Sequence, residues 1–207
     1  MKKKESFIIY CILGAVPVLF CFVTAWFVSA VLMDEKIVPT VALSGLGAGI
    51  IINIAFLQQW VMKAYQMNNK VLSAIYIFYS IGVLGFCMGV PILNFGVGII
   101  AGIYTARRMC HIKASTEEYE LKVKKTALFS AAVMLMMCFL TGTWALVGGM
   151  IGTRFESPVL SFTFTVPILA GIVLTGGLIL CLLQYWLTFI AAEITTKAWC
   201  GTSLRSE

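Results

Sequence analysis

The sequence predicts an all-α, polytopic integral membrane protein, a bundle of about six transmembrane helices arranged as three hairpins. Hydrophobic residues make up 60% of the 207 residues and charged residues only 12%, whereas an average soluble chain is about half apolar and a quarter charged. The apolar residues also form runs of about 20 residues or more, which is the length needed to cross a ~30 Å hydrocarbon layer. Only helices satisfy the backbone within such runs, so residues 1–207 are expected to form a single membrane domain.

Six apolar runs are predicted to span the bilayer. They cover Phe7 to Met33, Val38 to Met62, Val71 to Val90, Pro91 to Ala106, Thr126 to Gly152 and Leu160 to Ile190. The third and fourth are interrupted only by Gly89-Val90-Pro91, and a single helix over both would be about 54 Å long, too long for one crossing. Lys70 before them and Arg107 after them should lie on the same side, which predicts a hairpin that turns near Pro91.

The basic residues predict the orientation. With six spans, only Lys36 and Arg154 of the 15 Lys and Arg residues lie outside, as the positive-inside rule requires. Both termini are therefore expected in the cytoplasm, with the chain in a plasma or inner membrane. The N-terminal lysines followed by an apolar run resemble a signal peptide, but the run is about twice the usual length, so it is interpreted as a retained first span.

The longest polar connection, residues 107–125, is predicted to become helical from about residue 115. Ser115-Thr116-Glu117-Glu118 has the form of a capping box, and Glu120 with Lys124 is an i,i+4 ion pair in the favourable order. Five basic residues of this connection are Arg107, Arg108, Lys122, Lys124 and Lys125. Inside-positive topology accounts for them, and binding of anionic lipid headgroups, at about 1 kcal/mol each, is the alternative.

Glycine spacing predicts close helix packing. Four Gly-x-x-x-Gly pairs lie in the predicted spans: Gly45 with Gly49, Gly85 with Gly89, Gly98 with Gly102, and Gly148 with Gly152. Glycines four residues apart share one helix face and allow another backbone to approach. The functional alternative is that these faces slide in a transporter or bind the helix of a partner.

The polarity within the predicted spans is uncharged, since no Asp, Glu, Lys, Arg or His lies in the middle of any span. Coupling to protons or sodium through a buried carboxylate is therefore not expected. Asn53, Tyr79 and Asn94 are the candidate solute-binding residues, with an interhelical hydrogen bond as the alternative role of Asn53. Gln184, beside Tyr185 and Trp186, is expected near the cytoplasmic boundary, as an interfacial anchor or at the mouth of a pocket.

Enzyme chemistry is not indicated. The sequence contains no zinc, acyl-nucleophile or phosphate-loop motif, and His111 is the only histidine. The seven cysteines include no Cys-x-x-Cys pair and are interpreted as small hydrophobic residues. No enzyme activity, metal or cofactor is expected, and the net charge of +6 is explained by topology rather than by nucleic acid.

Two functional hypotheses are favoured over a third, an intramembrane enzyme acting on lipid, for which the sequence offers no set of acid, base or metal-ligating residues. The first is a transporter or substrate-binding membrane subunit for a neutral or amphipathic solute. The alternative is a non-catalytic accessory, immunity or signalling subunit that acts by helix packing with another membrane protein or with a second copy of itself. Both hypotheses fit the composition, and in both the lipid bilayer is the principal partner of the protein.

Overall fold

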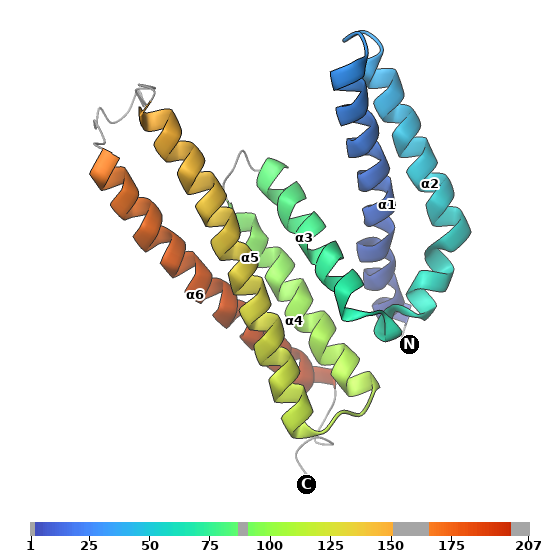
Figure 1. Ribbon diagram of the computed structural model, residues 1–207. Coiled ribbons are helices and arrows are strands. Elements are labelled where there is room, and N and C mark those ends of the chain that lie inside the picture. The colour runs from blue at the N-terminus through green and yellow to red at the C-terminus, as the bar shows by residue number, and fades with distance from the viewer. Residues whose placement is uncertain (1–2, 87–90, 151–165, 200–207) are drawn as a thin grey trace. The chain divides into compact units, whose positions relative to one another are not determined.

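The computed structural model describes residues 3–86, 91–150 and 166–199, and throughout these ranges the regular structure is helical (Figure 1). The α-helices are α1 (Lys3–Leu32), α2 (Val38–Met62), α3 (Asn69–Phe86), α4 (Asn94–His111), α5 (Thr116–Met150) and α6 (Val166–Trp199), with short 3-10 helices η1 (Ala64–Gln66) and η2 (Pro91–Leu93). The all-α prediction is confirmed, because continuous apolar runs satisfy their backbone only as helices in a bilayer.

Among the described residues, four helical stretches are long and apolar enough to cross a membrane: Ile9–Leu32, Val38–Met62, Thr116–Trp144 and Ala170–Ala198. Helices α3 and α4 have 18 residues each, or about 27 Å, and neither is among these four. Both are shorter than the four stretches, and α4 also ends in basic residues. The chain is thus a multi-pass helical membrane protein with four long candidate spans. Pro91, near which the sequence predicts a turn, is the first residue of η2, which leads directly into α4. Residues 87–90 lie outside the described residues, so the hairpin stays a prediction.

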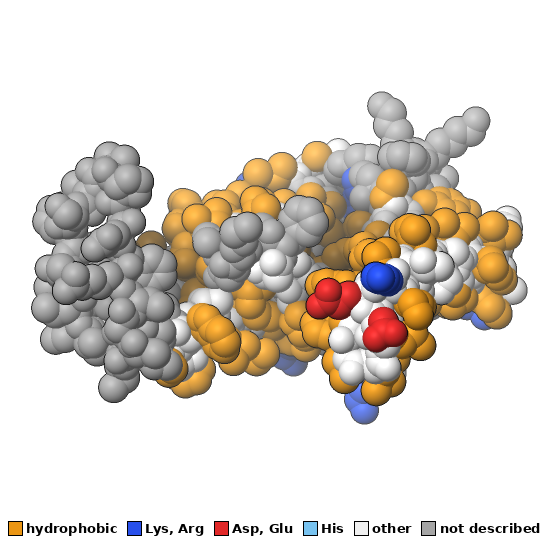
Figure 2. Space-filling model, turned by 90° about the horizontal axis from the view of Figure 1, so that it is seen from above, with side chains coloured by type: hydrophobic (Ala, Val, Ile, Leu, Met, Phe, Trp, Pro, Cys, Tyr) orange, Lys and Arg blue, Asp and Glu red, His pale blue; other side chains and the backbone are white. Residues whose placement is uncertain are grey.

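Large apolar side chains cover much of the outer surface. Trp144, Ile54 and Leu174 are 83%, 81% and 71% exposed, and Figure 2 shows hydrophobic side chains over much of the described surface in that view. No charged side chain is buried among the described residues. Surface of this kind is costly in water and is expected where lipid is the solvent.

The single membrane domain expected from the sequence divides into two compact units, Met1–Leu72 and Ser73–Glu207. The first unit contains the hairpin of α1 and α2, which lie side by side (Figure 1). Its helices approach closely at Gly45 and Gly49. A Cβ at Gly45 would lie 2.5 Å from Ala25 Cβ, and one at Gly49 would lie 2.5 Å from Val18 Cα, so these glycines allow backbone-to-backbone packing.

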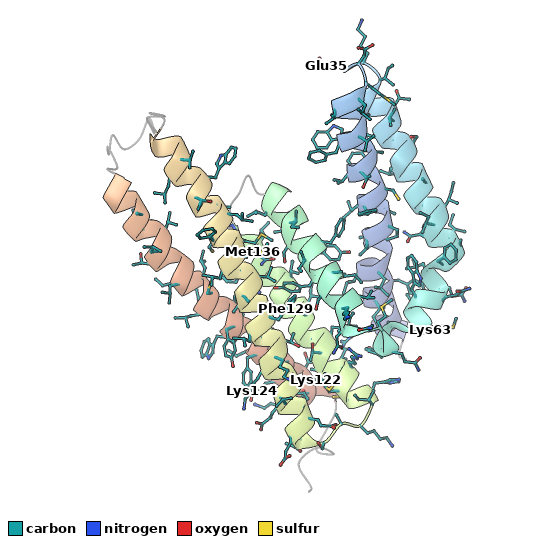
Figure 3. All side chains as sticks on the ribbon, viewed as in Figure 1. Glu35, Lys63, Lys122, Lys124, Phe129 and Met136 are labelled. Carbon is teal, nitrogen blue, oxygen red and sulfur yellow. The ribbon has the colours of Figure 1, made fainter. Side chains whose placement is uncertain are left out.

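The second unit packs most of α3 with α4, α5 and α6. Tyr76 of α3 packs with Val133 and Met137 of α5 in one apolar cluster, and Ala106, Val123 and Ala192 form another. The ring of Phe129 meets that of Tyr76 edge to face with centroids 5.4 Å apart. Met136, which Figure 3 labels on the same helix as Phe129, is half exposed, so α5 has one face in the bundle and one on the outside.

The glycine prediction has different outcomes at different positions. In the second unit, a Cβ at Gly102 would overlap the Thr188 carbonyl oxygen of α6, so α4 and α6 are in close contact there. A Cβ at Gly85 would meet no atom within 4 Å, and the packing role predicted for Gly85 therefore has no partner within the described chain. Glycine spacing alone does not determine whether another helix packs against the glycines. Gly89 and Gly152 lie outside the described residues, as do the surroundings of Gly148.

Candidate functional site

Buried polar side chains of the second unit form the candidate site, which we call the polar cluster. Its members come from four helices: Tyr76 and Ser80 of α3, Asn94 of α4, Ser130 of α5, and Gln184 and Thr188 of α6. Tyr76 is 7% exposed and each of the others is at most 1% exposed. Polar groups buried to this extent are costly unless they are hydrogen-bonded, so their partners decide what the cluster can do.

The Gln184 side chain links three helices. Its Nε2 donates to the Tyr76 hydroxyl at 3.2 Å and faces the backbone carbonyl oxygen of Asn94 at 3.5 Å. A carbonyl oxygen can only accept, so the nitrogen of the Gln184 amide must be the atom that faces it. The amide oxygen, Oε1, then lies on the other side, where the described protein provides no hydrogen-bond partner.

A second polar contact joins α5 to α6. The hydroxyls of Ser130 and Thr188 are 2.9 Å apart, and either can be the donor. Each also has a backbone acceptor within hydrogen-bond distance on its own helix, Ala127 O at 2.8 Å from Ser130 Oγ and Gln184 O at 2.9 Å from Thr188 Oγ1. Since each hydroxyl has one proton, one of them donates to the other hydroxyl while the second donates to its own helix. Such bonds between a hydroxyl and its own helix are the usual means by which Ser and Thr are satisfied in apolar surroundings. This part of the cluster is thus satisfied internally.

Asn94 is the least satisfied member of the cluster. Both atoms of its amide, Oδ1 and Nδ2, are buried without a hydrogen-bond partner among the described residues, as is Gln184 Oε1. The buried Ser80 hydroxyl is likewise without a hydrogen-bond partner among the described residues. An unpaired buried polar group costs about 1–3 kcal/mol. Several such groups together indicate either a strained resting state or a site whose partner is not part of the chain.

Gly98 makes the cluster geometrically possible. A Cβ at this position would overlap Gln184 Nε2 and would lie 2.8 Å from Thr188 Oγ1. The absence of a side chain on α4 therefore provides the space that the Gln184 amide occupies. Any larger residue at position 98 must push this amide away from Tyr76 and Asn94.

The cluster lies within the apolar length of its helices. Ser130 and Thr188 are five residues from the nearest charged residue on their helices and Tyr76 is six, or about 7 to 9 Å along the axis. No charged group is buried with them among the described residues. The described residues contain no group of three or more His, Cys, Asp or Glu side chains that could hold a metal ion. The cluster is thus a set of neutral hydrogen-bonding groups.

The three predicted solute-binding residues have different surroundings. Asn94 is part of the polar cluster, whereas Tyr79 is only partly buried and its ring lies against Phe78 of the same helix. Asn53 belongs to the first unit, where its Nδ2 donates to Gly14 O of α1 at 2.7 Å. This is the interhelical hydrogen bond considered as the alternative role of Asn53.

The Gln184 side chain is fully buried within the bundle and is not an exposed anchor. Its position near the cytoplasmic boundary, for which Tyr185 and Trp186 are the sequence signal, stays a prediction. Trp186 is 62% exposed, so neighbouring residues of one helix face opposite environments. Sequence reasoning missed Ser130 and Thr188, since single hydroxyl residues in an apolar run carry no signal that marks them as buried partners.

The predicted basic residues lie at one end of the second unit. Arg107 and Arg108 are in the last two turns of α4, and Figure 3 labels Lys122 and Lys124 near the beginning of α5. Lys124 forms an ion pair with Glu120 at 3.2 Å, with both side chains 58% exposed. An exposed pair of this kind contributes little to stability. Binding of anionic headgroups by these residues stays a prediction.

Comparison with known proteins gives no match to a family model, to a curated protein or to a solved structure.

Proposed function

We propose that this protein binds a small neutral solute in the polar cluster and carries it across the membrane. The observation that supports the proposal is the buried amide of Asn94, neither atom of which has a hydrogen-bond partner in the described chain. A residue needed only for packing would be better served by an apolar side chain of similar size, because leaving both polar atoms unpaired is costly. A solute that pairs with this amide would remove that cost.

The neutrality of the solute follows from the surroundings of the cluster. The buried polar residues of the second unit are amides and hydroxyls, with no buried charge among the described residues to compensate an ion. An isolated ion in apolar surroundings carries a large desolvation penalty. Ion-coupled pumping through a buried carboxylate has no support in this arrangement.

The topology that we propose for this function is six spans in three hairpins, with both termini in the cytoplasm of a plasma or inner membrane. Helices α3 and α4, at 18 residues each, are about 27 Å long, close to the ~30 Å thickness of the hydrocarbon core. The orientation is supported by the distribution of the basic residues along the chain. Cysteine accessibility labelling from each side of the membrane would test it.

The function is tested by solute flux in proteoliposomes. Vesicles containing the wild-type chain are mixed with hyperosmotic solutions of small neutral solutes, and reswelling is followed by light scattering. We expect faster reswelling than in protein-free vesicles, with the difference lost in Asn94→Leu. Asn53→Leu is the matched control, because it removes the same amide from the first unit, where it bonds to Gly14.

Two results would contradict the proposal. One is reswelling by every solute at the protein-free rate, and the other is an unchanged flux in Asn94→Leu. The intact mass of the assembly purified in mild detergent is measured on the same preparation. A second protein at fixed stoichiometry together with no solute flux would support the accessory-subunit hypothesis instead.

A further inference from the structure

The unpaired atoms of the polar cluster define a specific pattern of donors and acceptors. Asn94 Nδ2 has two N–H groups and Asn94 Oδ1 has two lone pairs, all without a hydrogen-bond partner among the described residues. Gln184 Oε1 provides a further unpaired acceptor on an amide whose Nε2 already faces Asn94 O. A ligand that fits must present a donor and an acceptor side by side, with a further donor for Gln184.

We propose that the polar cluster is a binding site for a small primary carboxamide or urea, an inference that rests on the proposed function. The C=O and the adjacent N–H of such a ligand match the Nδ2 and Oδ1 of Asn94 in a two-bond amide pair. The second N–H of the ligand is then available for Gln184 Oε1. Binding of this kind forms and breaks no covalent bond.

Other classes of ligand match the pattern less well. A carboxylate brings two acceptors and a charge, so it would oppose Asn94 Oδ1 and find no buried cation in the described residues. An apolar ligand would leave all of the unpaired atoms unsatisfied. A polyol such as glycerol has hydroxyls that donate and accept but lacks the fixed C=O and N–H edge, so it serves as the neutral comparison.

Gly98 is a positioning residue for this site. It leaves room for the Gln184 amide, which a Cβ at position 98 would overlap. Tyr76 then fixes the direction of that amide by accepting its N–H at 3.2 Å. With the nitrogen held by Tyr76 and Asn94 O, the oxygen is kept as the acceptor that the ligand would use. Gly98→Ala should therefore weaken binding although residue 98 contributes no polar atom to the ligand.

The test measures binding directly and separately from flux. Acetamide, glycerol and acetate are each mixed with purified full-length protein in detergent, and saturation transfer from protein to ligand is recorded by NMR. We expect transfer to acetamide in the wild type and at least tenfold weaker binding in Asn94→Leu and Gln184→Met. Asn53→Leu, which carries the same substitution in the first unit, should bind acetamide like the wild type.

The variants are chosen so that loss of binding is not mistaken for loss of folding. Because both Asn94 side-chain atoms are unpaired, Asn94→Leu should melt at or above the temperature of the wild type. Equal signals for glycerol and acetamide, or an unchanged acetamide signal in Asn94→Leu, would overturn the ligand assignment. Acetamide binding without solute flux would leave the assignment standing and refute the transport function, whereas flux of glycerol without acetamide binding would do the reverse.

Discussion

Replacing Gly49 by Ala provides a direct test of how the α1–α2 hairpin is held together. The added Cβ would lie 2.5 Å from Val18 Cα, 2.8 Å from Pro17 O and 3.0 Å from Val18 N. All three are backbone atoms, so no side-chain rotation can relieve the overlap. The helices would have to separate by about 1 Å at this level to restore ordinary van der Waals contact.

The expected loss of stability follows from this geometry. Overpacking of a tight contact costs about 1–3 kcal/mol, while exchanging Gly for Ala in a helix returns up to about 1 kcal/mol through backbone entropy. Because no side-chain rotation relieves the contact, the cost should lie in the upper part of its range, about 2–3 kcal/mol, which leaves a net loss of about 1–2 kcal/mol. For a chain of this size, each kcal/mol corresponds to about 2–4 °C in Tm.

Gly47→Ala is the matched control on the same helix. A Cβ at Gly47 would meet no atom within 4 Å, so only the favourable propensity change remains. Thermal unfolding of both variants is followed by circular dichroism in one mild detergent, with Gly49→Ala expected to melt several degrees lower and Gly47→Ala at or above the wild type. If Gly49→Ala is as stable as the wild type, or both variants lose stability equally, the proposed backbone contact is wrong.

Three further substitutions test local interactions by thermal unfolding or amide exchange. Ser115→Ala removes the acceptor of an N-cap bond at 3.3 Å and should cost about 1 kcal/mol; the reasoning fails if amide exchange in the first turn of α5 is not faster. Asn53→Leu breaks the 2.7 Å bond to Gly14 O but also removes the unpaired Oδ1. Because these two effects oppose each other, the free energy of unfolding should change by less than about 1 kcal/mol. A much larger loss would show that Asn53 Oδ1 has a partner. Lys124→Ala breaks an exposed ion pair with Glu120 and should change stability by no more than about 0.5 kcal/mol, with a shift of more than a few degrees in Tm as the contrary result.

Local features of this protein were predictable because their causes are local. The apolar run 38–62 became α2 with the same bounds, Val38–Met62, since run length and backbone satisfaction are properties of a continuous segment. The beginning of α5 at Thr116 follows from a bond between the Glu118 amide and Ser115 Oγ, three residues apart. The sequence alone thus determined an all-helical membrane chain, its apolar segments and the absence of charge within them.

The polar cluster was decided only by the tertiary structure. Gly85 and Gly98 carry the same Gly-x-x-x-Gly signal, yet one meets no described atom and the other lies against Gln184. Gln184 and Tyr76 bond across 108 positions of the chain, so neither residue has a neighbour in sequence that indicates the other. Periodicity specifies which residues share a helix face, whereas the helix that covers this face is selected by packing among segments far apart along the chain.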